Sequence, residues 1–269
     1  MGKITETIVA VRGGGDLATG VIQKLVRAGF KVAVLETAEP LMIRRTVALG
    51  TAVINQSATV EDMTAVLANP AEAGDVWAKG QVPVLVDPEG LSLQLLQPQI
   101  VVDAILAKKN LGTTKAMAPV TIALGPGFNA PSDVDVVIET MRGHSLGKLI
   151  FNGSSLPNTG TPGLIEGKDK ERVIHAPASG IVIHKRAIGD QVAEGEILFT
   201  IDEQPVRSTL SGTLRGLIAE GTKVAAGLKV ADIDPRSHVD CWSISDKARA
   251  LGGAVLEAAL FAGRQKNLF

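Results

Sequence analysis

The sequence of 269 residues predicts an α/β domain with a Rossmann-like, mostly parallel sheet, a small all-β barrel-sandwich domain and a C-terminal helix. Three observations lead to this prediction. A glycine turn at residues 13–15 joins an apolar strand to an amphipathic helix, apolar runs rich in β-branched residues recur as far as residue 139, and residues 179–202 align with residues 211–234. Unbroken apolar strands are typical of parallel sheets covered on both faces, and repeated strand-and-turn patterns are typical of small all-β domains.

A β-α-β unit surrounds the glycine turn. An apolar run ends at the turn, the helix that follows carries apolar residues on one face, and a second apolar run ends at Glu36. Gly13, Gly15 and Ala18 fill the dinucleotide-binding pattern G-x-G-x-x-A. In that pattern the glycines let a pyrophosphate approach the backbone, and an acid about 20 residues on holds a ribose hydroxyl. The predicted binding residues of this unit are Gly13, Gly14, Gly15, Asp16, Leu17, Ala18 and Glu36, and Asp16 stands where an N-cap is expected.

Later apolar runs extend the predicted sheet. Strands are expected at residues 53–54, 82–87, 100–105, 120–124 and 134–139, and a helix is expected at residues 59–67. Asp103 closes one of these strands, and Gly125 and Gly127 follow the next. Because ligands of open α/β sheets gather at the carboxyl ends of strands, we expect these three residues to share a crevice with the glycine turn. Beyond the last strand, Arg142 could hold an anion and His144 could move a proton.

The chain is expected to divide into four segments. Residues 1–150 form the nucleotide-binding α/β domain, and residues 151–171 form a loop or linker rich in glycine and proline. Residues 172–235 form the barrel-sandwich domain, and residues 236–269 carry a helix that packs on the α/β domain, with Ser245 as its N-cap. Packing of this helix on a second copy of the chain would instead make a homo-oligomer.

The barrel-sandwich prediction depends on an internal repeat. Residues 179–202 and 211–234 align without gaps at an offset of 32, with 9 identities in 24 positions concentrated at turn glycines. The pattern resembles biotinyl and lipoyl carrier domains, in which a lysine between the two halves receives the cofactor. The corresponding tip here, residues 202–206, reads Asp-Glu-Gln-Pro-Val and has no lysine. We therefore expect no covalently bound biotin or lipoate.

Composition excludes several classes of function. The net charge is −1 and the chain has no tyrosine and two tryptophans, so neither nucleic acid nor a membrane surface is an expected partner. The single cysteine, Cys241, fits a reducing cytoplasm and excludes a site with several cysteines. No apolar run approaches the roughly 18 residues that span a bilayer. The four histidines have no ligand-like spacing, so no metal site is expected.

Several longer motifs resemble one known family. They are residues 12–20, Glu36 with Pro40 and residues 43–45, residues 102–104 with residues 107–110, residues 125–128, residues 138–144 and residues 157–160. They resemble the accessory proteins of bacterial selenium-dependent molybdenum hydroxylases and, more distantly, the xanthine dehydrogenase accessory family. The resemblance implies a role in maturing a molybdenum hydroxylase client. A dinucleotide site at the glycine turn would suit the molybdopterin cytosine dinucleotide cofactor, but the resemblance identifies no catalytic residue.

Two alternatives remain open at this point. The glycine turn with its following acid also looks like the NAD-dependent dehydrogenase that acts on precorrin-2. Glu36 would then select NAD over NADP, and Asp103 or His144 would be the acid–base group. The second alternative is a non-catalytic scaffold with an empty turn.

Overall fold

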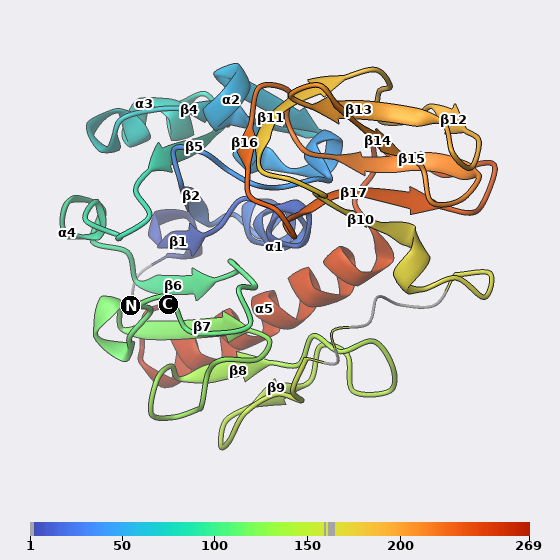
Figure 1. The fold of residues 1–269 in the computed structure, drawn as a ribbon. Coiled ribbons are helices and arrows are strands. Elements are labelled where there is room, and N and C mark those ends of the chain that lie inside the picture. The colour runs from blue at the N-terminus through green and yellow to red at the C-terminus, as the bar shows by residue number, and fades with distance from the viewer. Residues whose placement is uncertain (1–2, 159, 161–164) are drawn as a thin grey trace. The chain divides into compact units, whose positions relative to one another are not determined.

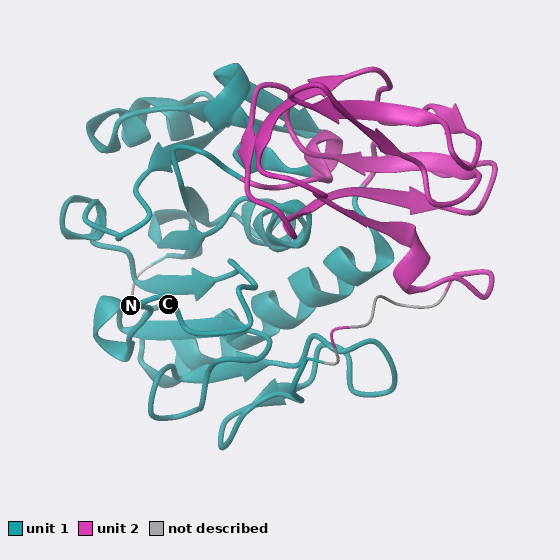
Figure 2. Cartoon of the chain, in the orientation of Figure 1, with its two compact units in different colours: residues 1–40, 48–158, 244–269 teal, residues 41–47, 159–243 magenta. Residues whose placement is uncertain are grey.

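The computed structural model describes residues 3–158, 160 and 165–269. The chain forms two compact units (Figure 2). Unit 1 consists of Met1–Pro40, Ala48–Asn158 and Ile244–Phe269, and unit 2 consists of Leu41–Val47 and Thr159–Ser243. Thr159 and residues 161–164, which belong to the predicted loop and in part to the last resemblance motif, lie outside the described residues.

Unit 1 is built on one nine-stranded sheet in the order β3-β4-β5-β2-β1-β6-β7-β8-β9 (Figure 1). The strands are β1 Ile8–Arg12, β2 Lys31–Glu36, β3 Ser57–Val60, β4 Met63–Leu67, β5 Val82–Val86, β6 Ile100–Asp103, β7 Val120–Leu124, β8 Val136–Ile138 and β9 Leu149–Ile150. The pairs from β4 to β8 are parallel, whereas β3 pairs antiparallel with β4 and β9 pairs antiparallel with β8. All seven strands from β4 to β8 in this order therefore point their carboxyl ends to the same edge of the sheet.

Two long helices of unit 1 pack closely on one another. They are α1, Asp16–Arg27, and α5, Asp246–Gln265, whose N-cap is Ser245 as predicted. A Cβ at Gly20 would fall against the backbone of Ala248, and a Cβ at Gly252 would fall against the backbone of Gly20. The close approach therefore depends on two glycines. The remaining helices are short: α2 Ala52–Asn55, α3 Ala73–Ala78 and α4 Leu93–Leu96. Helices α3 and α4 contribute side chains to a core cluster with strand residues such as Ala10, Ala33 and Leu85.

Two predicted elements of this sheet are wrong. Residues 53–54 belong to the short helix α2 instead of a strand. The helix predicted at residues 59–67 is the hairpin of β3 and β4, which turns at Glu61 with a φ of +52°. The β-branched residues Thr59, Val60, Thr64 and Val66 favour this hairpin, because branched side chains pack well on a pleated surface.

Unit 2 contains two four-stranded antiparallel sheets, ordered β10-β17-β15-β12 and β14-β13-β11-β16. Their strands are β10 Val173–His175, β11 Gly180–His184, β12 Gln191–Val192, β13 Ile197–Ile201, β14 Gln204–Arg207, β15 Gly212–Leu217, β16 Lys223–Val224 and β17 Lys229–Asp234. The predicted repeat coincides with β11–β13 and β15–β17. Each copy contributes strands to both sheets, so the repeat locates strands without determining how they pair.

The fold class predicted from the sequence is wrong. The sheet of unit 1 is mixed, and the full helices that a Rossmann-like domain places between successive parallel strands are missing from its second half. Helix α4 has four residues, and the described residues between β6 and β7 contain only the 3-10 turn Lys115–Met117. Apolar β-branched runs predict buried strands correctly, but they carry no information on what connects those strands. The chain is therefore described by a nine-stranded mixed sheet and two four-stranded antiparallel sheets.

Candidate functional site

The turn between β1 and α1 is held by its first two glycines. Gly13 has a φ of +93°, and its N–H donates to the carbonyl oxygen of Leu35 at 2.8 Å. A Cβ at Gly13 would lie 3.0 Å from the carbonyl oxygen of Ala104, and a Cβ at Gly14 would lie 2.7 Å from the Cα of Gly50. Both glycines are therefore needed for packing, whether or not the turn binds a ligand.

Gly15 differs from its two neighbours. A Cβ built at this residue meets no atom within 4 Å. The prediction of Asp16 as N-cap is wrong, because Gly15 is the N-cap of α1 and Asp16 is the first residue of the helix. The carbonyl oxygen of Gly15 accepts hydrogen bonds from the backbone N–H and the hydroxyl of Thr19. Because glycine has no side chain, it cannot cap the N–H groups of the first helical turn. The N-cap of this 12-residue helix therefore has open space at its Cβ position, and N–H groups at a helix start are able to receive an anion.

Glu36 lies beside the turn, as predicted, but its carboxylate is engaged with the backbone. One carboxylate oxygen accepts the N–H of Gly14 at 2.8 Å, and the other accepts the N–H of Thr37 at 2.8 Å. The residue predicted to hold a ribose hydroxyl therefore holds the glycine turn itself. This role explains an acid at the end of β2 without any ligand.

Asp103, at the end of β6, is buried within a polar cluster. Its carboxylate accepts the hydroxyl of Thr113 at 2.6 Å and the N–H of Ile105 at 3.1 Å, and it lies 3.9 Å from the Arg12 guanidinium. The Arg12 side chain also donates to Thr113 and, at 2.7 Å, to the carbonyl oxygen of Pro88. Burial raises the pKa of Asp103, and the hydrogen bonds and Arg12 oppose this shift without cancelling it. Asp103 is only 2% exposed, and its partners are the loop that follows β6 and Arg12 of β1 rather than a ligand.

The carboxylates that follow β5 and β8 behave in the same way. Asp87 accepts the N–H groups of Leu91 and Ser92 at 2.8 and 2.7 Å. Burial would raise the pKa of Asp87, but these hydrogen bonds outweigh burial and lower it. Glu139 accepts the N–H groups of Met141 and Leu156 at 2.7 and 2.8 Å. Along this edge of the sheet, carboxylates at strand ends therefore organise the loops that follow them.

Gly125 and Gly127 also serve packing in the structure. Both have positive φ, at +82° and +106°. A Cβ at Gly125 would lie 2.8 Å from the hydroxyl of Thr140, and a Cβ at Gly127 would lie 2.5 Å from the Cα of Lys109. The predicted crevice residues Asp103, Gly125 and Gly127 thus lie at one edge of the sheet. The two glycines, however, pack against neighbouring loops.

Lys247, in the first turn of α5, was not predicted from the sequence. Its ammonium is half-buried, and its pKa is lowered by burial and by Arg142, against the opposing charges of Asp16, Glu139 and Asp246. The interaction with Asp16 brings a cation of α5 near the start of α1. The pattern around Ser245 predicts where α5 begins, but the charge interaction of Lys247 with Asp16 follows from the close packing of α5 on α1.

The other polar residues predicted near this edge, Arg142 and His144, do not point to a binding site. Arg142 forms a bidentate ion pair with Asp246, at 2.8 and 3.0 Å, and His144 is exposed.

In unit 2, Cys241 is fully buried, and burial raises the pKa of its thiol. Among the residues that the structure describes, no cluster of three or more His, Cys, Asp or Glu could hold a metal ion. Within the same residues, no helix has the length and apolar character to cross a membrane.

Comparison with known sequences finds one close relative. A protein of Escherichia coli (strain K12), described as an uncharacterized protein YqeB, is 51% identical over 255 residues, which are 94% of this chain and 47% of that protein. The chain therefore spans about half the length of the curated relative it matches. No family model matches the chain.

Solved structures offer only weak likenesses. An aspartoacylase family protein of Mesorhizobium loti is 8% identical and covers 81% of this chain and 61% of its own at a TM-score of 0.26. The ectoine utilization protein EutE (DoeB) of Ruegeria pomeroyi is 10% identical and covers 84% of this chain and 85% of its own, also at 0.26. TM-scores this low carry no argument about fold or activity, and these likenesses give no support to the Rossmann and barrel-sandwich combination.

Proposed function

We propose that unit 1 binds a phosphate-bearing nucleotide at the turn between β1 and α1. The observation that carries this proposal is the open space at Gly15, at the start of a helix whose N-cap has no side chain. Backbone N–H groups and the positive end of the helix dipole both favour a phosphate at such a position. A Gly15 retained only for packing would be expected to contact a neighbouring atom, as Gly13 and Gly14 do.

The charges around the turn are compatible with an anion. Asp16 would repel a phosphate at the helix start, but Lys247 interacts electrostatically with Asp16 and supplies a positive charge to the same region. Lys247 is half-buried, so its charge is screened less than that of a fully exposed lysine. We assign to Lys247 the role of balancing the negative charge that the ligand and Asp16 bring together.

The resemblance to accessory proteins of molybdenum hydroxylases suggests which ligand this site binds and why. We propose that the protein handles a dinucleotide, molybdopterin cytosine dinucleotide being the leading candidate, while a cytoplasmic molybdenum hydroxylase is matured. In this proposal the client enzyme is the protein partner and the glycine turn receives the pyrophosphate. No residue is assigned a catalytic role.

Asp103 weighs against the alternative of an NAD-dependent dehydrogenase. That alternative requires an acid–base group near the nicotinamide. Asp103 is 2% exposed and hydrogen-bonded to Thr113, and the second candidate, His144, lies on an exposed loop. Binding without hydride transfer therefore accounts for the residues of this edge better than a dehydrogenase does.

The test is to identify what the purified protein binds. Small molecules released on denaturation are analysed by mass spectrometry, and CDP, CTP, NAD and NADP are titrated into the ligand-free protein by calorimetry. A bound cytidine or pterin species would support the proposal. Binding of NAD alone would favour the dehydrogenase, and failure of every nucleotide to bind would leave a scaffold with an unused turn.

A further inference from the structure

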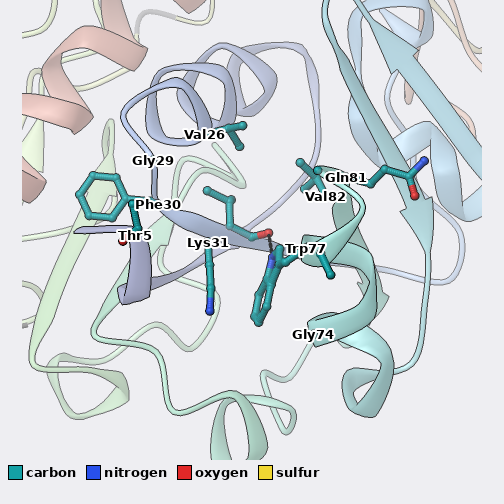
Figure 3. Close-up of a pocket in the computed structure, with 12 residues that line it drawn as sticks. Thr5, Val26, Gly29, Phe30, Lys31, Gly74, Trp77, Gln81 and Val82 are labelled. Atoms are coloured by element: carbon teal, nitrogen blue, oxygen red, sulfur yellow. Dashed lines mark hydrogen bonds between the residues drawn. The ribbon is translucent and has the colours of Figure 1, made fainter. Parts of the chain in front are cut away.

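A further feature of unit 1 lies at the opposite edge of its sheet. A cavity of about 370 Å³ opens beside the first residues of β2 and β5, Lys31 and Val82 (Figure 3). Since these strands run parallel to β1, this edge carries their amino ends and the glycine turn follows the carboxyl end of β1. The volume is at the lower end of the range for small-molecule sites, about 300 to 1,000 Å³.

Trp77 forms one wall of the cavity and is held in place. Its indole N–H donates to the carbonyl oxygen of Val32 at 2.8 Å, the bond that Figure 3 draws as a dashed line. Because the indole N–H is bonded to the backbone, the ring is fixed against β2 and its remaining surface is apolar. Phe30, Val26 and Val82 contribute further apolar surface to the lining.

Lys31 supplies the charge of the cavity. Its ammonium nitrogen lies 6.0 Å from the centre of the Trp77 ring, within the range of a cation–π contact. Within the part of the chain that the structure describes, no carboxylate forms an ion pair with Lys31. Gln81 and Thr5 are further polar residues of the lining, and neither carries a charge.

We propose that this cavity binds a small aromatic molecule that carries one negative charge. The aromatic ring would pack on Trp77, and the anionic group would pair with Lys31. Aromatic surfaces favour offset or edge contacts with one another, and an ammonium beside a carboxylate forms a charge-assisted hydrogen bond. This proposal does not rest on nucleotide binding, because the cavity shares no residue with the glycine turn.

Phenylacetate and its uncharged amide, phenylacetamide, are the probes that test this proposal. Trp77 and Trp242 are the two tryptophans, so a Trp242→Phe background leaves Trp77 as the sole indole reporter. Each probe is titrated against this protein while Trp77 fluorescence is followed, and the affinities are checked by calorimetry. Phenylacetate is expected to give a saturable change and to bind at least about tenfold more tightly than phenylacetamide.

Two lysine variants separate the proposed contact from a general charge effect. Lys31→Met is expected to lower the affinity for phenylacetate about tenfold and to leave that for phenylacetamide unchanged. Lys79→Met removes an exposed lysine that does not line the cavity and should leave both affinities as they were. No saturable change in Trp77 fluorescence or in heat, or equal affinity of phenylacetate for the parent and Lys31→Met, would overturn the proposal.

Discussion

The carboxylate of Glu36 accepts a hydrogen bond from the backbone N–H of Gly14, with 2.8 Å between the oxygen and the nitrogen. This bond joins the end of β2 to the turn after β1, and the other carboxylate oxygen accepts the N–H of Thr37. The same device recurs after β5, β6 and β8, where Asp87, Asp103 and Glu139 accept N–H groups of the loops that follow them. The edge that would receive a nucleotide is thus organised by its own carboxylates.

Replacing Glu36 should destabilise the protein, and the loss of stability should depend on how many of its two backbone hydrogen bonds remain. Glu36→Ala is expected to lower the free energy of unfolding by about 1.5 to 3 kcal/mol, because a charged acceptor is removed from two backbone N–H groups. Glu36→Gln keeps one carbonyl acceptor and should lose about half as much. Urea unfolding measures both values. Equal stability of Glu36→Ala and the parent would mean that the carboxylate does not hold the turn.

Gly15→Val should separate nucleotide binding from folding. The fold has room for the side chain, since a Cβ at Gly15 meets no atom within 4 Å, but the side chain would occupy the space proposed for the phosphate. We expect nucleotide affinity to fall at least about a hundredfold while the unfolding free energy changes by about 1 kcal/mol or less.

Gly253→Val is the matched control for this variant. Gly253 also has open space around its Cβ position, but it lies in α5 away from the turn. The control should bind nucleotide as the parent does. Unchanged nucleotide affinity in Gly15→Val would remove the phosphate-site assignment.

Two adjacent glycines of α5 should respond to alanine in opposite directions. A methyl group at Gly252 would strike the backbone of Gly20, so Gly252→Ala should destabilise the protein by about 1 to 3 kcal/mol through overpacking of α5 on α1. Gly253 is exposed and unobstructed, and Gly253→Ala should stabilise the protein by about 0.5 to 1 kcal/mol, since alanine favours helix. Thermal and urea unfolding of the pair measures the difference. Equal effects of the two substitutions would contradict the close crossing of these helices.

The sequence predicts local structure better than it predicts how distant segments meet. The strand ends at Arg12 and Leu124, and the N-cap at Ser245, agree with the structure because apolar runs and capping residues act over a few neighbouring positions. The predicted helix at residues 59–67 fails because Glu61 adopts a positive φ and turns the chain back into a hairpin. No local pattern signals such a turn at a glutamate.

The candidate site shows the same limit. The glycine turn and Glu36 were predicted as neighbours from a known spacing, and they are in contact. The sequence could not show that the carboxylate of Glu36 bonds to the turn, nor that the charge of Lys247 acts on Asp16. Both depend on contacts between residues far apart in the chain, and these are set by packing rather than by local sequence.

Cys241 should be unreactive in the folded protein. Its side chain is fully buried, and burial raises the pKa of its thiol although Arg44 and Arg215 act in the opposite direction. Because the thiolate is the reactive form, a thiol-specific reagent at neutral pH should label the protein only after denaturation. The rate of labelling is followed by absorbance. Rapid labelling of the native protein would mean that this thiol is accessible and available for chemistry.

Asp87 should give the folded protein an acid-sensitive contribution to stability. Burial opposes ionisation of Asp87, but hydrogen bonds from Ser92 and Leu91 lower its pKa below the unfolded value of about 3.9. An acid with a lowered folded pKa stabilises the fold fully above its unfolded pKa and loses that contribution as pH falls through the folded pKa. Asp87→Asn should therefore be less stable than the parent at pH 6, and the gap should shrink as pH falls below about 4.

Asp103→Asn is the control of opposite sign. Burial raises the pKa of Asp103, so between about 3.9 and its folded pKa the folded protein binds more protons than the unfolded chain, and this residue makes stability fall as pH rises. Relative to Asp103→Asn, the parent should therefore lose stability as pH rises through that range. Relative to Asp87→Asn, the parent should gain stability as pH rises toward about 4. Urea midpoints of the three proteins across the same pH series measure both differences. Parallel pH profiles for the two variants would show that these carboxylates do not differ in the way their hydrogen bonds and burial require.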